Sequence, residues 1–397
     1  MSTRPKRQIS DLAAFGGPPL FETPLHVGRP NLGDRSRLHA RIDEALDRRV
    51  LSNGGPLAEE FERALQPVTR APYVRVVANA TIGLQVLARA LDLDGEVVMP
   101  AFTFVGSAHA FEWIGLRPVF ADIDEETMLL DPAAVEEVIT PRSSAFLGVH
   151  LYGRVCDVDG LSAVARRHGI PLLLDAAQAL GSQARGRPVG TFGQAEVLSF
   201  HATKMVNAFE GGAITTADER LADVIDPVRN FGFVDWDEAA SLGTNAKMSE
   251  ASAAMGLTSL EHLDRLLAIY RRNAHRYAQA VADIPGVGAT GVAGIDESNA
   301  QHVVLRVDAQ AAGISRDRLV ELLWAEGVRV RRYFYPGAHR LAPYRERSRQ
   351  PSLPVTDRVA SEVICLPTGE GVGDAAIDAV GDTIRFILSQ APALATG

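Results

Sequence analysis

Cysteine is scarce in this sequence, with only Cys156 and Cys365 among 397 residues. The two form neither a CxxC pair nor a metal-binding spacing, which excludes a disulfide framework and suits a reducing cytoplasm. Long apolar runs are also missing, since none reaches the length that a bilayer-spanning helix needs. We therefore expect a cytoplasmic location, no metal site and no membrane partner.

Positive charge is in deficit as well. The 49 acidic residues outnumber the 40 basic ones and give a formal net charge of −9. Nucleic-acid binding relies on clustered lysine and arginine, so this balance argues against a nucleic-acid partner. An anionic small molecule could still bind, because a local basic cluster outweighs distant acids that salt screens.

The chain is long enough, and at 46% hydrophobic residues apolar enough, for two packed domains. Short apolar runs alternate with helical segments between residues 96 and 151, which predicts an α/β fold with a mainly parallel sheet. Residues 11–36 are rich in glycine and proline and are typical of an extended surface arm. The apolar stripe from Leu260 to Val281 predicts one long helix that bridges the domains. Strands are expected at 302–307 and 328–333 in a smaller C-terminal unit.

Lys204 lies between two apolar strands in the stretch 197–214. Ser199 and Thr203 precede it, and a glycine pair follows before the second strand begins. An amine fixed at a sheet edge, beside hydroxyls that can bind phosphate, suits Schiff-base chemistry on a pyridoxal cofactor. Most lysines are simply solvated surface residues, so this one needs supporting features.

Asp175 supplies such a feature, because it ends the apolar run that starts at Ile170 and is followed by Gln178. A carboxylate at the end of a buried strand is a poor core residue but a good partner for a protonated pyridine nitrogen. A third feature is the helix predicted to start near Ala80 and Thr81, whose free N–H groups can seat a phosphate. Asn79 as an ordinary helix cap is the alternative there.

The motifs at 175–178, 199–204 and 210–212 resemble the signatures of the DegT/DnrJ/EryC1/StrS family of sugar aminotransferases. The likeness extends from about residue 51 to the C-terminus. In the stretches 51–57 and 243–250 it is similar to the desosamine-pathway branch that aminates the 4-position of a dTDP-4-keto-6-deoxyglucose. The resemblance implies the fold-type I architecture: an arm (1–36), a large domain (37–265) with a mainly parallel seven-stranded sheet flanked by helices, and a small C-terminal α/β domain (266–397).

The resemblance also implies a cofactor, pyridoxal 5'-phosphate, with pyridoxamine 5'-phosphate as its amino-bearing form. Lys204 and Asp175 would be catalytic. The expected cofactor-binding residues are Ala80, Thr81, Phe104, Asp175, Gln178, Ser199, Lys204 and Asn245. The expected substrate-binding residues are His201, Lys247, Arg331, Phe334 and His339.

Some of these roles have competing interpretations. Phe104 follows a strand and would stack on the pyridine ring, although core filling is the usual fate of phenylalanine. Arg331 belongs to a basic run that is usually a solvated strand face, although arginine also suits phosphate or carboxylate. Asn245 and Lys247 would reach the other subunit's site in a homodimer.

The implied reaction transfers an amino group from glutamate to a dTDP-linked keto-deoxysugar, for deoxyaminosugar biosynthesis of the antibiotic type. A 3-keto sugar is the alternative substrate. Sugar dehydratases of the same fold carry histidine where this chain has Lys204. A non-enzymatic regulator would have no reason to keep Asp175, Gln178 and Lys204 together, and a nicotinamide dehydrogenase would need a G-x-G-x-x-G that is missing after the first strand.

Overall fold

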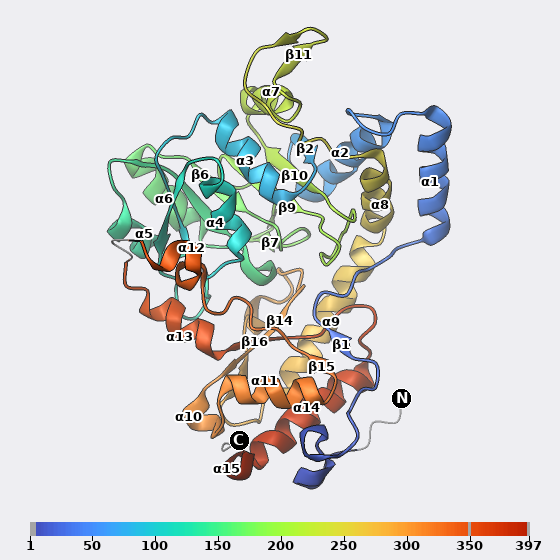
Figure 1. Ribbon diagram of the computed structural model, residues 1–397, viewed down its shortest axis with the longest axis vertical. Coiled ribbons are helices and arrows are strands. Elements are labelled where there is room, and N and C mark those ends of the chain that lie inside the picture. The colour runs from blue at the N-terminus through green and yellow to red at the C-terminus, as the bar shows by residue number, and fades with distance from the viewer. Residues whose placement is uncertain (1–4, 348–350, 395–397) are drawn as a thin grey trace.

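The structure is a computed structural model that describes residues 5–347 and 351–394. Residues 1–4 of the predicted arm and 395–397 of the predicted small domain lie outside these described residues. Within them the chain forms a large α/β part, drawn at the top of Figure 1, and a smaller part, drawn below it. None of the helices in these ranges is both long and apolar enough to cross a membrane.

A seven-stranded sheet of order β2-β10-β9-β6-β5-β3-β4 forms the centre of the large part. The strands are β2 (Tyr73–Val77), β3 (Glu96–Pro100), β4 (Arg117–Ala121), β5 (Ser143–Val149), β6 (Leu172–Asp175), β9 (Ala195–Ser199) and β10 (Gly212–Thr216). β10 is antiparallel to β2 and β9, and the other neighbours are parallel. The predicted mainly parallel sheet is confirmed. Every residue of β3, β6 and β10 is buried, as expected for strands covered on both faces.

The large part also contains eight helices among the described residues, and the first of them packs against the last rather than against the sheet. They are α1 (Arg35–Arg48), α2 (Pro56–Thr69), α3 (Ala80–Ala90), α4 (Val105–Glu112), α5 (Pro132–Val138), α6 (Val158–His168), α7 (Glu219–Val228) and α8 (Glu250–Leu260), with the short turn η3 at Leu151–Gly153. Several begin at a polar cap, as their sequences predict: the Asp34 carboxylate accepts from Ser36 N at 2.8 Å, and Asn79 Oδ1 accepts from Ile82 N at 2.9 Å.

The predicted long helix is present as α9 (Leu263–Val281), but it starts at Leu263 rather than at Leu260. α8 ends at Leu260, and α9 starts after a tight turn in which His262 N donates to Ser259 O at 3.1 Å. The prediction was wrong at its start, because the repeat of apolar residues runs on through a turn that holds no special residue. α9 does lead from the large part into the small part (Figure 1).

The small part has a three-stranded antiparallel sheet made of β13 (Val287–Ala289), β14 (Val303–Val307) and β16 (Val363–Leu366). Its other elements are η4 (Val292–Gly294), α10 (Ala309–Ala312), α11 (Arg316–Ala325), η5 (Ala338–Arg340), α12 (Ala342–Arg345), α13 (Pro354–Glu362), α14 (Asp374–Ser389) and α15 (Ala391–Leu394). The strand expected at 328–333 is only β15 (Val328–Arg329), because its partner β1 (Leu25–His26) is equally short.

The N-terminal arm is anchored to the small part. Its elements are η1 (Ile9–Asp11), η2 (Ala13–Phe15) and β1, which pairs in parallel with β15. The buried carboxylate of Glu326 accepts from Ala13 N at 2.7 Å and from Leu20 N at 2.8 Å. These buried contacts fix an arm that its composition alone describes only as irregular.

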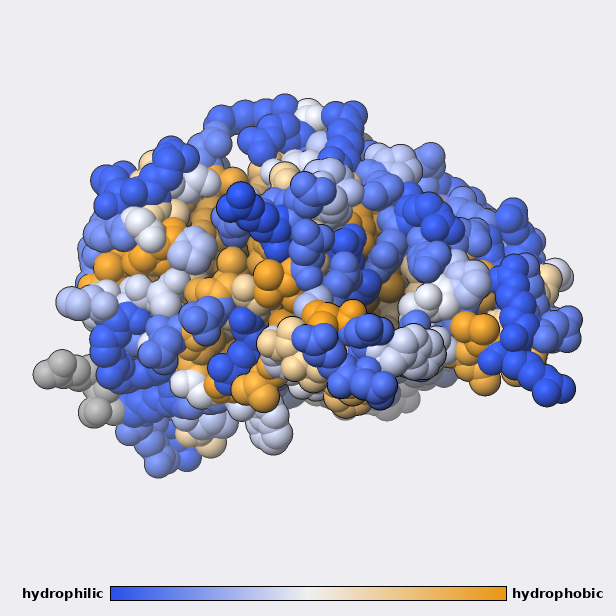
Figure 2. Space-filling view, turned by 90° about the horizontal axis from the view of Figure 1, so that it is seen from above, coloured by the Kyte–Doolittle hydropathy of each residue, from blue (hydrophilic) through white to orange (hydrophobic). Residues whose placement is uncertain are grey.

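Two hairpins complete the fold, β7 (Gln183–Ala184) with β8 (Arg187–Pro188) and β11 (Phe233–Asp235) with β12 (Glu238–Ala239). The β11–β12 hairpin stands away from the body at the top of Figure 1. It and its flanks expose large apolar side chains, among them Trp236, which is 94% exposed, and Leu242, which is 90% exposed. Viewed from above, apolar residues gather in the middle of this end of the molecule (Figure 2).

Candidate active site

Lys204 lies in the turn that joins β9 to β10. Hydrogen bonds close this turn, from Phe200 N to Gly211 O at 2.8 Å, from Lys204 N to His201 O at 2.8 Å and from Ala208 N to Phe200 O at 2.7 Å. The side chain of Lys204 is half-buried. Burial lowers the pKa of its amine to about 8, while the charge of Asp175 acts in the opposite direction.

Asp175 is 7% exposed at the carboxyl end of β6, the strand next to β9. Its Oδ2 accepts from Ser107 Oγ at 2.7 Å, and its Oδ1 accepts from Ala177 N at 3.0 Å. Because Asp175 acts on the pKa of Lys204, the two groups lie near each other at one edge of the sheet. Ser107, on α4, follows no motif of its own and was not among the predicted residues.

The start of α3 lies directly against β10. Asn79 Oδ1 caps Ile82 N, so the Ala80 and Thr81 N–H groups are left over, and no protein acceptor faces them within residues 5–347 and 351–394. Gly212 allows the close approach, since a Cβ there would lie 2.8 Å from Ala80 N. A Cβ on Gly106 would likewise lie 2.9 Å from the Phe104 ring and 3.6 Å from Thr81 Oγ1. The two glycines therefore let the start of α3 pack closely against β10 and let α4 pack closely against the Phe104 ring.

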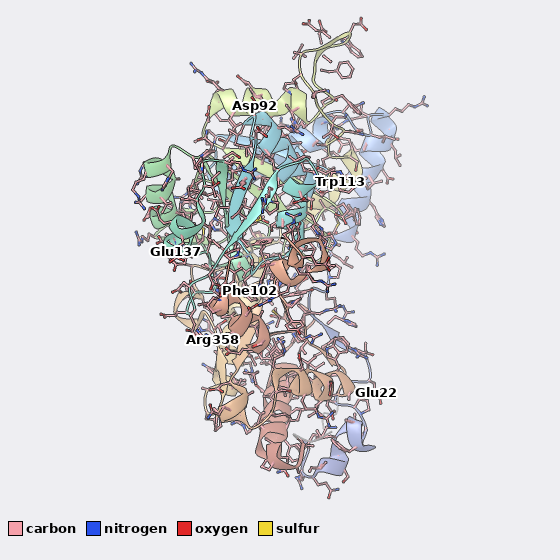
Figure 3. The ribbon with its side chains drawn as sticks, turned by 60° about the vertical axis from the view of Figure 1, so that its left-hand side comes forward. Glu22, Asp92, Phe102, Trp113, Glu137 and Arg358 are labelled. Atoms are coloured by element: carbon pink, nitrogen blue, oxygen red, sulfur yellow. The ribbon has the colours of Figure 1, made fainter. Side chains whose placement is uncertain are left out.

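Phe104 is 59% exposed and is therefore not a core residue. Its ring centroid lies 6.2 Å from that of Phe334, which stacks on Tyr152 at 6.2 Å and on Tyr333 at 5.0 Å. Phe102 joins the same group, at 6.4 Å from Phe334, and lies where the large part meets the small part (Figure 3). The loop of residues 333–339, which the resemblance predicts to be a substrate-side loop, thus reaches the carboxyl end of β3 through aromatic contacts.

Gln178 is buried three residues after Asp175. Its Oε1 accepts from Tyr152 N at 2.8 Å, which fixes the amide and leaves its Nε2 end to donate elsewhere. Ser199 ends β9 opposite Gly212, and its Oγ accepts from His201 N at 3.3 Å. Ser199 therefore lies beside the Lys204 turn and the start of α3.

Two predicted residues, His201 and Asn245, are exposed at this edge, and Lys247 is half-buried. The His201 ring bonds Thr203 Oγ1 at 2.9 Å. Asn245 is exposed and bridges to Asn230, while Lys247 Nζ lies 4.4 Å from the centre of the Phe231 ring. Ala246 O, between them, accepts from Ala78 N at 2.7 Å, so this segment borders the start of α3.

The basic run in the small part separates into distinct environments. Arg332 bonds Asp317 Oδ1 at 2.8 Å and lies over the Tyr335 ring. Arg331 is exposed, and among the described residues no acidic side chain pairs with it. His339 is buried, with Nε2 3.0 Å from Asp357 Oδ1, and lies beside Phe120 rather than beside Lys204. The structure does not bring His339 together with the other predicted residues, because packing of η5 against β4 and α13 encloses it.

His302, at the start of β14, was missed by the sequence reasoning. Burial, with a smaller contribution from the Lys204 charge, lowers the pKa of its imidazole to about 3. Its ring contacts those of Tyr152 at 5.8 Å and Tyr333 at 6.0 Å, and its Nδ1 is buried without a hydrogen-bond partner in the described chain. Its distance of 98 residues from Lys204 in the sequence leaves no local signal for this contact.

A cavity of about 700 Å³ lies away from the Lys204 turn, between α2, β2 and the start of the β11–β12 hairpin. Lys247 and Asn230 are in its wall. Its arginines Arg75 and Arg229 are already paired with Asp226, at 2.8 and 2.7 Å. We place the candidate site at the Lys204 turn, where the charge of Asp175 acts on the amine from the neighbouring strand.

The arrangement fits pyridoxal 5'-phosphate. It offers a half-buried amine with a lowered pKa, a carboxylate one strand away, an exposed aromatic face and a helix start with free N–H donors. The glycine at 212 lets the start of α3 lie directly against β10. The part of the chain that the structure describes contains no cluster of residues able to hold a metal ion.

Comparison with known proteins agrees with this description. The profile of the DegT/DnrJ/EryC1/StrS aminotransferase family matches residues 34–385. A dTDP-4-amino-4,6-dideoxy-D-glucose transaminase of Shigella dysenteriae is 34% identical over 368 residues, which are 92% of this chain and 100% of that protein.

Two solved structures are also similar. The crystal structure of DesI, determined in the presence of its TDP-sugar product, is 50% identical, with a TM-score of 0.94 and 98% coverage of both chains. DesV from S. venezuelae, in complex with a ketimine intermediate, is 30% identical, with a TM-score of 0.83 and coverage of 91% of this chain and 98% of that one.

Proposed function

The chain belongs to the DegT/DnrJ/EryC1/StrS aminotransferase family, and we propose that it aminates a dTDP-linked keto-deoxysugar, dTDP-4-keto-6-deoxy-D-glucose, to give dTDP-4-amino-4,6-dideoxy-D-glucose. The observation that carries this proposal is the Lys204 amine, with its lowered pKa, at the same sheet edge as Asp175. The name of the Shigella relative and the TDP-sugar product in the DesI structure support the choice of sugar. The amino sugar would serve natural products of the antibiotic type.

Members of this family use pyridoxal 5'-phosphate, which supplies an electrophilic carbon and an electron-withdrawing ring when it is bound. Asp175 would hold the ring nitrogen protonated. Ser107, on α4, fixes that carboxylate by donating a hydrogen bond to it. Gln178 would donate from Nε2 to the ring hydroxyl, because its Oε1 is already occupied by Tyr152 N. Phe104 would cover one face of the ring.

The phosphate would bind where α3 begins. Ala80 N–H and Thr81 N–H point out of the first turn, where the helix dipole adds a partial positive charge. The Ser199 hydroxyl lies at the end of the neighbouring strand, and the exposed Asn245 would serve the partner subunit's phosphate. This phosphate-binding site needs no lysine or arginine.

Lys204 would hold and move the proton at its Nζ. With a pKa of about 8, an appreciable fraction of the amine is uncharged near neutral pH, whereas an ordinary lysine would be almost fully protonated. An uncharged Nζ can take a proton from the carbon that bears the donor's amino group. We propose glutamate as that donor. Burial at the turn limits the access of water to the amine.

The substrate would enter past the exposed His201 and Arg331 and the half-buried Phe334. His201 and Phe334 border the Lys204 turn and Phe104, and Arg331, which has no acidic partner in the described part, would meet the sugar nucleotide's phosphates or the donor's carboxylate. Lys247 would act from the partner subunit. His339 has the weakest claim, because Asp357 and Phe120 enclose it.

We further propose a homodimer with shared active sites. The β11–β12 hairpin and its flanks expose Phe231, Phe233, Val234, Trp236 and Leu242, and contiguous exposed apolar side chains favour a protein partner. Asn245 and Lys247 follow directly after this hairpin in the chain. The free cysteines Cys156 and Cys365 support action in a reducing cytoplasm.

The experiment that tests the proposal is incubation of the purified protein, pyridoxal 5'-phosphate and glutamate with dTDP-4-keto-6-deoxyglucose or with a 3-keto isomer. NMR of the product then locates the new amine. Amination at carbon 4 supports the proposal, and amination at carbon 3 supports the alternative substrate. A protein that neither changes colour with the cofactor nor aminates either sugar would favour a regulator.

A further inference from the structure

The backbone of Met205, the residue after Lys204, is held by two side chains from outside the large part. Met205 N donates to Gln301 Oε1 at 3.2 Å, and Met205 O accepts from Asn31 Nδ2 at 3.1 Å. Gln301 belongs to the small part and Asn31 to the N-terminal arm. Both amides are buried, at 8% and 5% exposure, so water cannot replace these bonds at low cost.

These two bonds fix the backbone directly after Lys204, and that backbone determines where the Lys204 side chain points. The β9–β10 turn already contains its own hydrogen bonds before and after this point, but Met205 N and Met205 O bond outside the turn. Asn207, two residues later, donates from its Nδ2 to Asn31 O, so the arm holds the turn twice. A rotation of the peptide between Lys204 and Met205 would move the Lys204 side chain relative to Asp175.

The segment that carries Gln301 also holds the loop of Gln178. Asn299 Nδ2 donates to Gln178 O at 2.9 Å and to Leu180 O at 3.0 Å, and Asn299 N donates to Ser182 Oγ at 2.9 Å. Asn299 Oδ1 in turn accepts from Gln301 N at 3.0 Å. The short buried segment 299–301 therefore bonds both the Lys204 turn and the loop of Gln178.

We propose that Gln301, Asn299 and Asn31 are positioning residues for transamination, which hold the Lys204 turn and the Gln178 loop in the geometry that the reaction needs. The inference rests on the roles proposed above for Lys204 and Gln178. It means that the reactivity of an amine in the large part depends on the small part and the arm being in place. Displacement of a reacting group by about 1 Å can cost on the order of 100-fold in rate.

The test compares two substitutions of equal length, Gln301→Met and Gln301→Glu. Methionine removes the acceptor for Met205 N, and glutamate keeps one. We expect Gln301→Met to slow the reaction of Lys204 with pyridoxal 5'-phosphate, followed by absorbance, and to lower kcat about 10- to 100-fold with a smaller change in KM. Gln301→Glu should recover most of both rates.

Asn273→Leu is the control for simple destabilisation. Asn273 is an equally buried amide, but it bonds Thr368 Oγ1, Gly369 O and Val372 O, away from both loops. It should lower the melting temperature without slowing the Lys204 reaction. If Gln301→Met behaves like this control, or if Gln301→Glu recovers nothing, the positioning role is wrong. A wild-type protein whose Lys204 reacts with the cofactor but which aminates no sugar would refute the proposed function alone.

Discussion

Gly212→Ala should weaken cofactor binding, because Gly212 is where β10 meets the start of α3. A Cβ at this position would lie 2.8 Å from Ala80 N, 2.8 Å from Asn79 C and 2.9 Å from Leu198 O. All three are backbone atoms, so no side chain can rotate away, and either the helix start or the strand has to move. Ala80 N–H is one of the proposed phosphate donors.

The size of the effect follows from the overlap. Inserting a methyl group into a closely packed site costs about 1–3 kcal/mol. If the helix start moves to relieve this strain, the same free energy corresponds to roughly 5- to 150-fold weaker binding of pyridoxal 5'-phosphate. The assay is a titration of the cofactor-free protein followed by absorbance, together with the melting temperature of each variant.

Gly288→Ala is the matched control, because nothing lies within 4 Å of a Cβ at Gly288 in β13. It should leave both the affinity and the melting temperature near their wild-type values. Unchanged affinity in Gly212→Ala, with or without a lower melting temperature, would contradict the assignment of the phosphate to the start of α3.

Three further predictions concern the Lys204 amine, the Phe104 ring and the start of α2. The rate at which the cofactor-free protein combines with pyridoxal 5'-phosphate should rise with pH, reach half its maximum near pH 8, the pKa of Lys204, and level off about one unit above it, since the charged amine is unreactive; a rise that continues beyond pH 10 would show an ordinary lysine. Phe104→Ala should leave the melting temperature nearly unchanged but weaken cofactor binding roughly two- to tenfold, because stacking contributes about 0.5–1.5 kcal/mol. Glu250→Gln should lower the free energy of unfolding by about 1–3 kcal/mol, because the buried carboxylate accepts from Leu57 N and Ala58 N at 2.9 Å; equal thermal unfolding of the two proteins would refute this.

The features predicted from the sequence are those with a local signal. The strand that ends in Asp175, the turn around Lys204 and the capped helix start at Asn79 are each recognisable within about ten residues. The parallel order of their strands brings the carboxyl ends to one edge, so the meeting of Asp175 and Lys204 could be predicted without coordinates. The resemblance to a family added the roles of Gln178 and Ser199.

The features that were missed depend on contacts between distant residues. Ser107 bonds Asp175 across 68 residues, and Gln301 bonds Met205 across 96. A buried serine or glutamine has no periodic pattern, and its partner is decided by tertiary packing. The same reason explains His339, whose position in a substrate-side loop suggested binding, while its surroundings on η5 make it a packed residue beside Asp357.

Trapping of the bound cofactor tests the central claim most directly. The purified protein is incubated with pyridoxal 5'-phosphate, reduced with borohydride, digested and examined by mass spectrometry, beside a Lys204→Ala variant. The account predicts a single modified peptide with the cofactor mass on Lys204, and a variant that binds the cofactor reversibly but retains no mass and catalyses no turnover. Modification of another lysine, or near-normal turnover by Lys204→Ala, would contradict it.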